Sequence, residues 1–221
     1  MKNVFAYFVL IPLLFLGGCA RTPVASSPPV PVAEQAGHNR ASRQQTVNQP
    51  VSRAEIAQQV YVLLLQAREN QDGAAGNNGF VTPAAMQAEN GTTLPGDIKN
   101  HPLFLDIVKF LSYNFRGLTV DGTNSFQPDK PLSRAAFALL AEDILARMTG
   151  DDQLTRRYIG NVSPFADVPD DYFALNAIFV VTARGIMHPD ADSRFRPAAP
   201  ITRQEAADAL NTLSQGMEKK I

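Results

Sequence analysis

The fold can be inferred from residues 165–205, which read FADVPDDYFALNAIFVVTARGIMHPDADSRFRPAAPITRQE. The apolar segment 172–183 is typical of a buried helix, and glycine follows it at position 185. An aspartate-rich loop then leads to Phe195-Arg196-Pro197. Thr202 is a favourable N-cap residue, and it begins a helical segment that extends to Leu213. The stretch therefore predicts two helices joined by a loop.

The same order of features occurs earlier in the chain, which indicates an internal repeat. Phe126-Gln127-Pro128 precedes Phe195-Arg196-Pro197 by 69 residues, and Ser133-Arg134 precedes Thr202-Arg203 by the same number. A partial copy begins at Ser52-Arg53 and has only the final helix. We therefore expect one helical domain over 51–216, composed of a partial repeat (51–69) and two fuller repeats (101–148 and 163–214).

Apolar side chains recur at helical spacing in three further segments, namely 52–67, Leu103–Phe115 and 137–148. Residues 80–100 are ambiguous, with one helical turn expected near 83–89. The segment 116–131 contains Asp121-Gly122 and two prolines, which predict a loop. The predicted fold is all-α.

The N-terminus has the features of an export signal. Lys2 provides a positive start, and the apolar run 4–16 is too short to span a bilayer but suits a secretory signal. The run ends in Leu16-Gly17-Gly18-Cys19, which resembles the lipobox of bacterial lipoproteins. The resemblance implies that residues 1–18 are a cleaved signal peptide and that Cys19 carries the lipid. The alternative is a plain secretory signal with an incidental cysteine.

The composition and charge of the chain exclude some classes of protein and predict a disordered segment. Its 221 residues have a formal net charge of −1, so no overall field favours nucleic acid. The single cysteine excludes an intramolecular disulfide. Residues 20–50 are rich in Pro, Ala, Ser, Gln and Asn without apolar periodicity, which predicts a disordered tether over 19–50.

Several short motifs of the last repeat resemble the S-layer homology (SLH) family. They are Phe165-Ala166-Asp167-Val168-Pro169, Tyr172-Phe173-Ala174, Arg184-Gly185-Ile186, Phe195-Arg196-Pro197 and Thr202-Arg203-Gln204-Glu205. The resemblance implies SLH-type helical repeats that form a pseudo-three-fold helical bundle. Three positions depart from the family pattern: Phe173 replaces tryptophan, His188 replaces glycine, and Ala136 replaces the glutamate of the Thr-Arg-Ala-Glu motif.

Arginine occupies the first helical position in all three copies, at Arg53, Arg134 and Arg203. Capping boxes explain Ser52 with Glu55 and Thr202 with Glu205, but they do not explain a cation at the positive end of a helix dipole. Each arginine either pairs with an acid of a neighbouring repeat, such as Asp143 or Asp167, or binds an anionic ligand. Because Ala136 breaks one capping box, we expect the groove that uses Arg134 to be the least regular.

By the family resemblance, the candidate ligand-binding residues are Arg53, Arg134, Arg203, Asp167 and Gly185. The sequence predicts no catalytic residue, no cofactor and no metal, since it lacks HExxH and GxSxG motifs, and Asp190-Ala191-Asp192 lacks the remaining positions of a calcium loop.

The resemblance implies a non-catalytic cell-envelope lipoprotein that binds cell-wall glycan, either peptidoglycan or an associated acidic polymer. By the resemblance to bacterial lipoproteins, Ala20 rather than an aspartate after Cys19 implies a location at the outer membrane, facing the periplasm. The alternative is a protein-interaction accessory lipoprotein of an envelope complex, which a contiguous exposed apolar patch would favour.

Overall fold

A computed structural model describes residues 47–72 and 94–218 of the chain. The signal segment, Cys19, the tether up to residue 46 and the turn expected at 83–89 lie outside the described residues. Among the helices in the described ranges, none is both long enough and apolar enough to cross a membrane.

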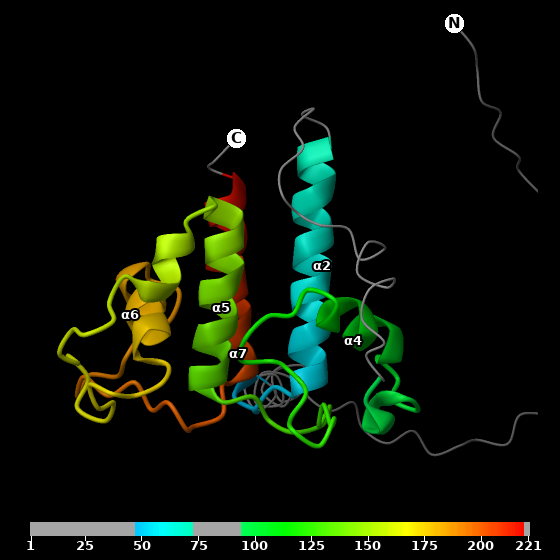
Figure 1. Cartoon of the computed structure of the whole chain (residues 1–221), viewed down its shortest axis with the longest axis horizontal. Coiled ribbons are helices and arrows are strands. Elements are labelled where there is room, and N and C mark those ends of the chain that lie inside the picture. Colours follow the sequence, from blue (N-terminus) through cyan, green and yellow to red (C-terminus); the bar gives the residue numbers. More distant parts are fainter. Residues whose placement is uncertain (1–46, 73–93, 219–221) are drawn as a thin grey trace, which may run out of the picture. The chain divides into compact units, whose positions relative to one another are not determined.

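The described residues are helical and contain no β-strand, so the all-α prediction is confirmed for this part of the chain. Figure 1 shows the arrangement. The α-helices are α2 (Arg53–Asp72), α4 (Phe104–Leu111), α5 (Arg134–Thr149), α6 (Leu175–Ala183) and α7 (Arg203–Glu218), with two short 3-10 helices, η1 (Gly96–Ile98) and η2 (Asp152–Arg156).

Helix α4 ends at Leu111, earlier than the predicted end at Phe115. The hydroxyl of Ser112 donates to the carbonyl of Lys109 at 2.6 Å, and Asn114 has a left-handed φ of 51°. The chain therefore turns back, and the Phe115 ring packs against Phe110 with 5.8 Å between ring centroids. Phe115 and Leu118 are apolar because they enter the core, which a helical pattern alone does not reveal.

Three short extended segments precede α2, α5 and α7, and they hydrogen-bond to one another in a ring. The Val51 N–H donates to the Ile201 carbonyl at 3.1 Å, the Ile201 N–H to the Leu132 carbonyl at 2.9 Å, and the Leu132 N–H to the Val51 carbonyl at 3.1 Å. All three side chains are buried. The starts of the three long helices are thereby fixed together.

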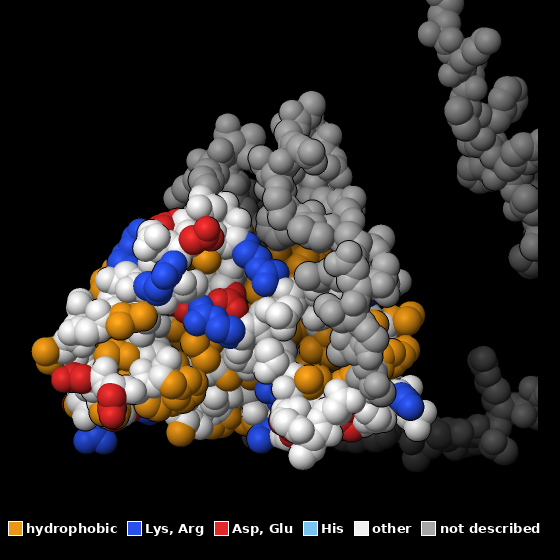
Figure 2. All heavy atoms as spheres, viewed as in Figure 1, with side chains coloured by type: hydrophobic (Ala, Val, Ile, Leu, Met, Phe, Trp, Pro, Cys, Tyr) orange, Lys and Arg blue, Asp and Glu red, His pale blue; other side chains and the backbone are white. Residues whose placement is uncertain are grey.

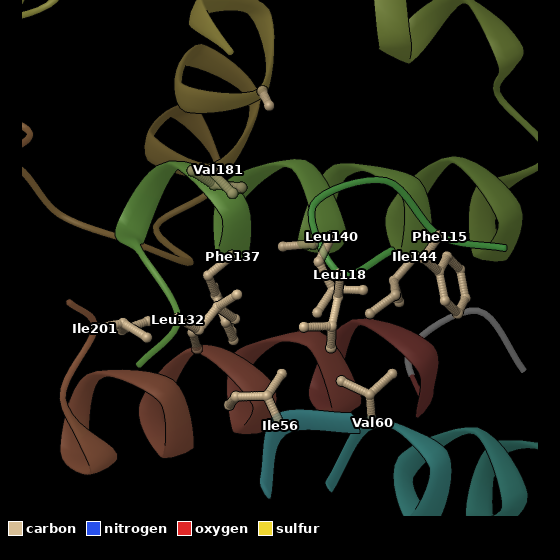
Figure 3. Close-up of a cluster of buried hydrophobic side chains, with 14 of the residues drawn as sticks. Ile56, Val60, Phe115, Leu118, Leu132, Phe137, Leu140, Ile144, Val181 and Ile201 are labelled. Atoms are coloured by element: carbon tan, nitrogen blue, oxygen red, sulfur yellow. The ribbon is translucent and has the colours of Figure 1, made fainter. Parts of the chain in front are cut away.

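Each shorter helix packs on a long helix of the preceding repeat. Helix α4 packs against α2, and α6 packs against α5, while α7 contacts both α2 and α5. The core lies between these helices, where Val60 of α2, Leu118 and Ile144 of α5 point into one buried cluster (Figure 3). Full burial of one such side chain stabilises the fold by about 1.5–3 kcal/mol.

Candidate ligand-binding junctions

One aspartate fixes the loop before each of the two later long helices. Asp167 accepts the N–H groups of Phe195 and Arg196, both at 2.8 Å. Asp97 accepts those of Phe126 at 3.1 Å and Gln127 at 2.7 Å. The role of Asp167 that the structure shows is to hold this loop by accepting its backbone N–H groups.

Asp97 is its counterpart in the middle repeat, and the sequence pattern missed it. The spacing could have identified Asp97, because it precedes Phe126 by 29 residues and Asp167 precedes Phe195 by 28.

A second aspartate shapes the turn within each loop. Asp121 accepts the N–H groups of Thr123 and Ser125, and the Thr123 hydroxyl with these amides lowers the pKa of Asp121 to about 2. Asp190 accepts from Asp192 and Arg194 in the same way. The left-handed residues also correspond, with φ of 57° at Asn124 and 56° at Ser193, and 54° at both Gln127 and Arg196. Asp190 therefore belongs to a turn, and the two loops share one backbone conformation.

We call the start of each long helix, with its arginine (Arg53, Arg134 or Arg203), a junction. At two junctions the arginine side chain hydrogen-bonds to the loop of the next repeat. Arg53 donates from Nε to the Phe126 carbonyl and from Nη2 to the Thr119 carbonyl, at 2.7 and 2.6 Å. Arg134 makes the corresponding bonds to Phe195 and His188, at 2.7 and 2.8 Å. Each guanidinium also lies over a phenylalanine ring, at 5.0 Å from the Phe126 centroid and 4.8 Å from that of Phe195. These contacts explain why a cation stands at the first helical position.

The capping glutamates complete two of the junctions. Glu55 accepts the Ser52 N–H at 2.9 Å with one oxygen and Arg203 at 2.6 Å with the other. Glu205 accepts the Thr202 N–H at 3.0 Å and pairs with Arg134. The acids that pair with these arginines are therefore the capping glutamates; the expected examples, Asp143 and Asp167, are wrong. The carboxylate of Asp143 instead accepts a hydrogen bond from the guanidinium of Arg116.

The junction of Arg53 lacks its glutamate, because Ala136 stands at that position. Ser133 still caps α5, accepting the Ala136 N–H at 3.2 Å. Within the described ranges, no carboxylate lies at ion-pair distance from Arg53, although Asp97 and Asp121 act on it electrostatically. The irregular junction is therefore that of Arg53, and the expectation for Arg134 is wrong. The reason is that each capping glutamate forms its ion pair with the arginine of a different helix.

The three arginines differ in exposure. Arg134 is 3% exposed, and this burial lowers the pKa of its guanidinium while the Glu205 carboxylate opposes the shift. The side chain of Arg203 is 37% exposed. Gly185 is exposed after α6 with a left-handed φ of 66°, so its visible role is a turn.

Arg203 lines a pocket of about 400 Å³ together with Ser52, Glu55, His101 and Asp129. Its Nε is buried and has no hydrogen-bond partner among the described residues. The corresponding loop of the first copy would precede residue 47, outside the described part of the chain. The junction of Arg203 thus offers a guanidinium, a helix start and a pocket, which together suit an anionic or polyhydroxylated ligand.

On the face shown in Figure 2, basic side chains lie beside acidic ones over α5 and its neighbouring loops, and apolar side chains are exposed below them. This face has no uniform positive potential. Whether a basic side chain can bind an anion therefore depends on whether an acidic side chain already pairs with it.

Comparison with family models shows that residues 164–207 match the S-layer homology domain. Neither the curated proteins nor the solved structures contain a match to the chain.

Proposed function

We propose that this chain, whose residues 164–207 form an S-layer homology domain, is a non-catalytic cell-envelope protein that binds cell-wall glycan through its repeats. S-layer homology domains bind cell-wall polymers, and this match is the observation that carries the proposal. It covers the repeat that contains Asp167, Gly185 and Arg203.

We further propose that α2, α5 and α7 form the pseudo-three-fold bundle expected of the family. The hydrogen-bonded ring of Val51, Leu132 and Ile201 supports it. So do the matching arginine contacts at Phe126 and Phe195. In this arrangement the partial first repeat contributes its long helix as the third member.

The ligand proposed for the junctions is peptidoglycan or an acidic polymer attached to it. Guanidinium groups bind carboxylate and phosphate through paired hydrogen bonds, and helix starts add favourable N–H donors. The pocket of about 400 Å³ beside Arg203 lies in the size range of ligand-binding pockets.

The membrane attachment proposed for Cys19 rests on the lipobox resemblance alone. Stable anchoring needs more than one acyl chain, at about 0.8 kcal/mol per buried CH₂. Replacing Cys19 with serine should release the protein into the soluble periplasmic fraction or leave it unprocessed. Recovery of a mature-sized variant in the outer-membrane fraction would show that the anchor lies elsewhere.

The wall-binding proposal is tested by incubating the full chain with purified sacculi and measuring the fraction that sediments. We expect sedimentation above a matched sample without sacculi. In parallel, crosslinking in intact cells should yield products with wall material rather than one discrete protein adduct. Failure to sediment would contradict wall binding.

A second candidate function is protein interaction within an envelope complex. Its support is the exposure of Ile159, Val162 and Phe173, at 69%, 78% and 73%, within the stretch 159–173 at the start of the last repeat. Exposed apolar side chains that gather in one place mark interaction surfaces. A single crosslinked protein partner together with no binding to sacculi would favour this function.

A further inference from the structure

The outer faces of the long helices α5 and α7 differ in what covers them. Helix α6 packs on α5, where Ala138 and Glu142 are buried and Asn176 of α6 donates to the Glu142 carboxylate. The repeat spacing of 69 residues places Ala207 and Asn211 of α7 at the same two positions, and both are exposed. In the described part of the chain, no short helix covers α7 as α6 covers α5.

A groove of about 380 Å³ lies on this face, between α2 and α7, and we call it the amide groove. Figure 3 shows the two helices side by side. Nine residues line the groove, and none of the nine is charged. Leu63 and Leu210 are buried at its base, while Val62 is 44% exposed and lies on α2 between Gln59 and Gln66.

The absence of charge extends along both helices of the groove. Residues 56–67 of α2 and 209–216 of α7 contain no charged side chain, whereas the equivalent segment of α5, 140–147, contains three. A helix face that stays in water normally carries charged side chains, and the core of a protein interface is depleted of them. The composition of the amide groove is therefore that of an interface core.

From these observations, we infer that the protein forms a symmetric dimer in which the amide groove of one copy packs on the amide groove of a second copy. A two-fold axis brings each residue of a shared face close to its own counterpart, so like charges on that face would repel. Gln59, Gln66 and Asn211 avoid this repulsion, because each neutral amide has both donors and an acceptor and can pair with its own copy.

These amides are also available for such pairing. Within the described residues, the side-chain amides of Gln59, Gln66 and Asn211 form no hydrogen bond, in contrast to Gln58, which donates to Asp106 at 2.9 Å. The groove carries no charge that would select an acidic or a basic partner. Its chemistry therefore favours a second copy of the same neutral face.

The size of the face indicates how strong the dimer should be. The uncharged segment 56–67 extends about 18 Å, and two helices side by side are about 20 Å wide. Such a face is smaller than the roughly 800 Å² per partner that a stable complex buries. We therefore expect a weak dimer, with a dissociation constant in the micromolar range or weaker. Attachment of both copies to one membrane would raise their effective concentration.

The inference is tested by exchanging charges at Val62, which lies in the middle of the groove and so near the two-fold axis. Two full-length copies with different tags are produced together, one carrying a photo-crosslinking benzoylphenylalanine in place of Gln66, and intact cells are irradiated. We expect a product that contains both tags. Val62→Glu in both copies, or Val62→Lys in both, should lower its yield about fivefold or more, because like charges then face each other. Val62→Glu in one copy with Val62→Lys in the other should restore it.

Three controls make the result specific. The melting temperatures of Val62→Glu and Val62→Lys should lie within about 3 °C of that of the unmodified chain, because the side chain is half-exposed. Ala191→Glu adds the same charge in an exposed loop and should leave the yield within about twofold. Benzoylphenylalanine in place of Asp192, in the same exposed loop, should give no product with both tags.

Three outcomes would overturn the inference. They are the absence of a product with both tags from the unmodified Val62 copies, a yield that the charge variants do not change, and a mixed pair that fails to restore it. A crosslink from position 66 to a different protein, or to another segment of the same chain, would assign the groove to that occupant instead. None of these readouts depends on sacculi, so the wall-binding proposal stands whichever result is found.

Discussion

At the scale of single residues, Phe126 and Phe195 show what holds the repeats together. Both rings are fully buried, and each lies under a junction arginine. Truncating either to alanine should lower the free energy of unfolding by about 3–5 kcal/mol. Urea denaturation measures this, with Phe173→Ala as the exposed control, expected within about 0.5 kcal/mol of the unmodified chain. A loss of less than about 1 kcal/mol at Phe195 would contradict the packing described.

Glu142 is a buried acid away from the junctions. Its side chain is 1% exposed, Arg116 donates to one carboxylate oxygen at 2.6 Å, and Asn176 donates to the other. Burial raises the pKa of Glu142, although Arg116 and Asn176 oppose the shift. The folded state therefore holds this proton more tightly than the unfolded state does.

The stabilising effect of this proton is complete below the unfolded pKa and is lost as pH rises through the folded pKa. We predict that Glu142→Gln becomes more stable relative to the unmodified chain as pH rises from about 4 to about 7. Parallel urea titrations at several pH values measure this difference. A difference that does not change with pH would show that Glu142 has the same pKa in both states.

At the scale of elements, the long helices were predictable because their signals are local. Apolar spacing and a Ser or Thr cap mark the starts of α2, α5 and α7, and the structure places their first helical residues at Arg53, Arg134 and Arg203. The end of α4 was not predictable, because the turn at Asn114 is set by packing of Phe115. The role of Asp97 was also hidden, since its partners lie in a loop about 30 residues away.

The helix caps provide a prediction at this scale. Thr202→Ala removes an acceptor for the Glu205 N–H and a donor to the Glu205 carboxylate, which also holds Arg134. We expect a loss of about 1–2 kcal/mol in the free energy of unfolding. Ser133→Ala should cost about 1 kcal/mol, because it removes the cap alone.

Thermal or urea unfolding compares the two variants, with Asp192→Ala in an exposed turn as the control. Equal losses for the two caps would contradict a shared role of Glu205 in capping and in the junction.

At the scale of the whole molecule, the arginine partners required the three-dimensional arrangement. Arg134 and Glu205 are 71 residues apart, and Arg203 and Glu55 are 148 residues apart. The ring of Val51, Leu132 and Ile201 helps to bring these helix starts together. The sequence therefore identified the arginines as unusual, and it could not identify which acid each one meets.

The boundary between tether and folded domain leads to a prediction at the same scale. Val51 is buried and its N–H donates to the Ile201 carbonyl, so the chain is held in the folded domain at that residue. Limited proteolysis of the full chain should first cut within residues 20–50 and leave a stable fragment that begins near Val51. Mass spectrometry identifies the fragment. An N-terminal region that resists cleavage longer than the domain would contradict the predicted tether.

The most direct test of wall binding is the fraction of full chain that sediments with purified sacculi as salt is raised from about 0.05 to about 0.5 M, a range over which exposed ionic contacts become screened. We predict clear sedimentation at the lowest salt and a steady decline as salt increases. The melting temperature, followed at the same salt concentrations, should show that the protein stays folded throughout. Absence of sedimentation at the lowest salt, or sedimentation that does not depend on salt, would contradict recognition of an acidic wall polymer through the arginine junctions.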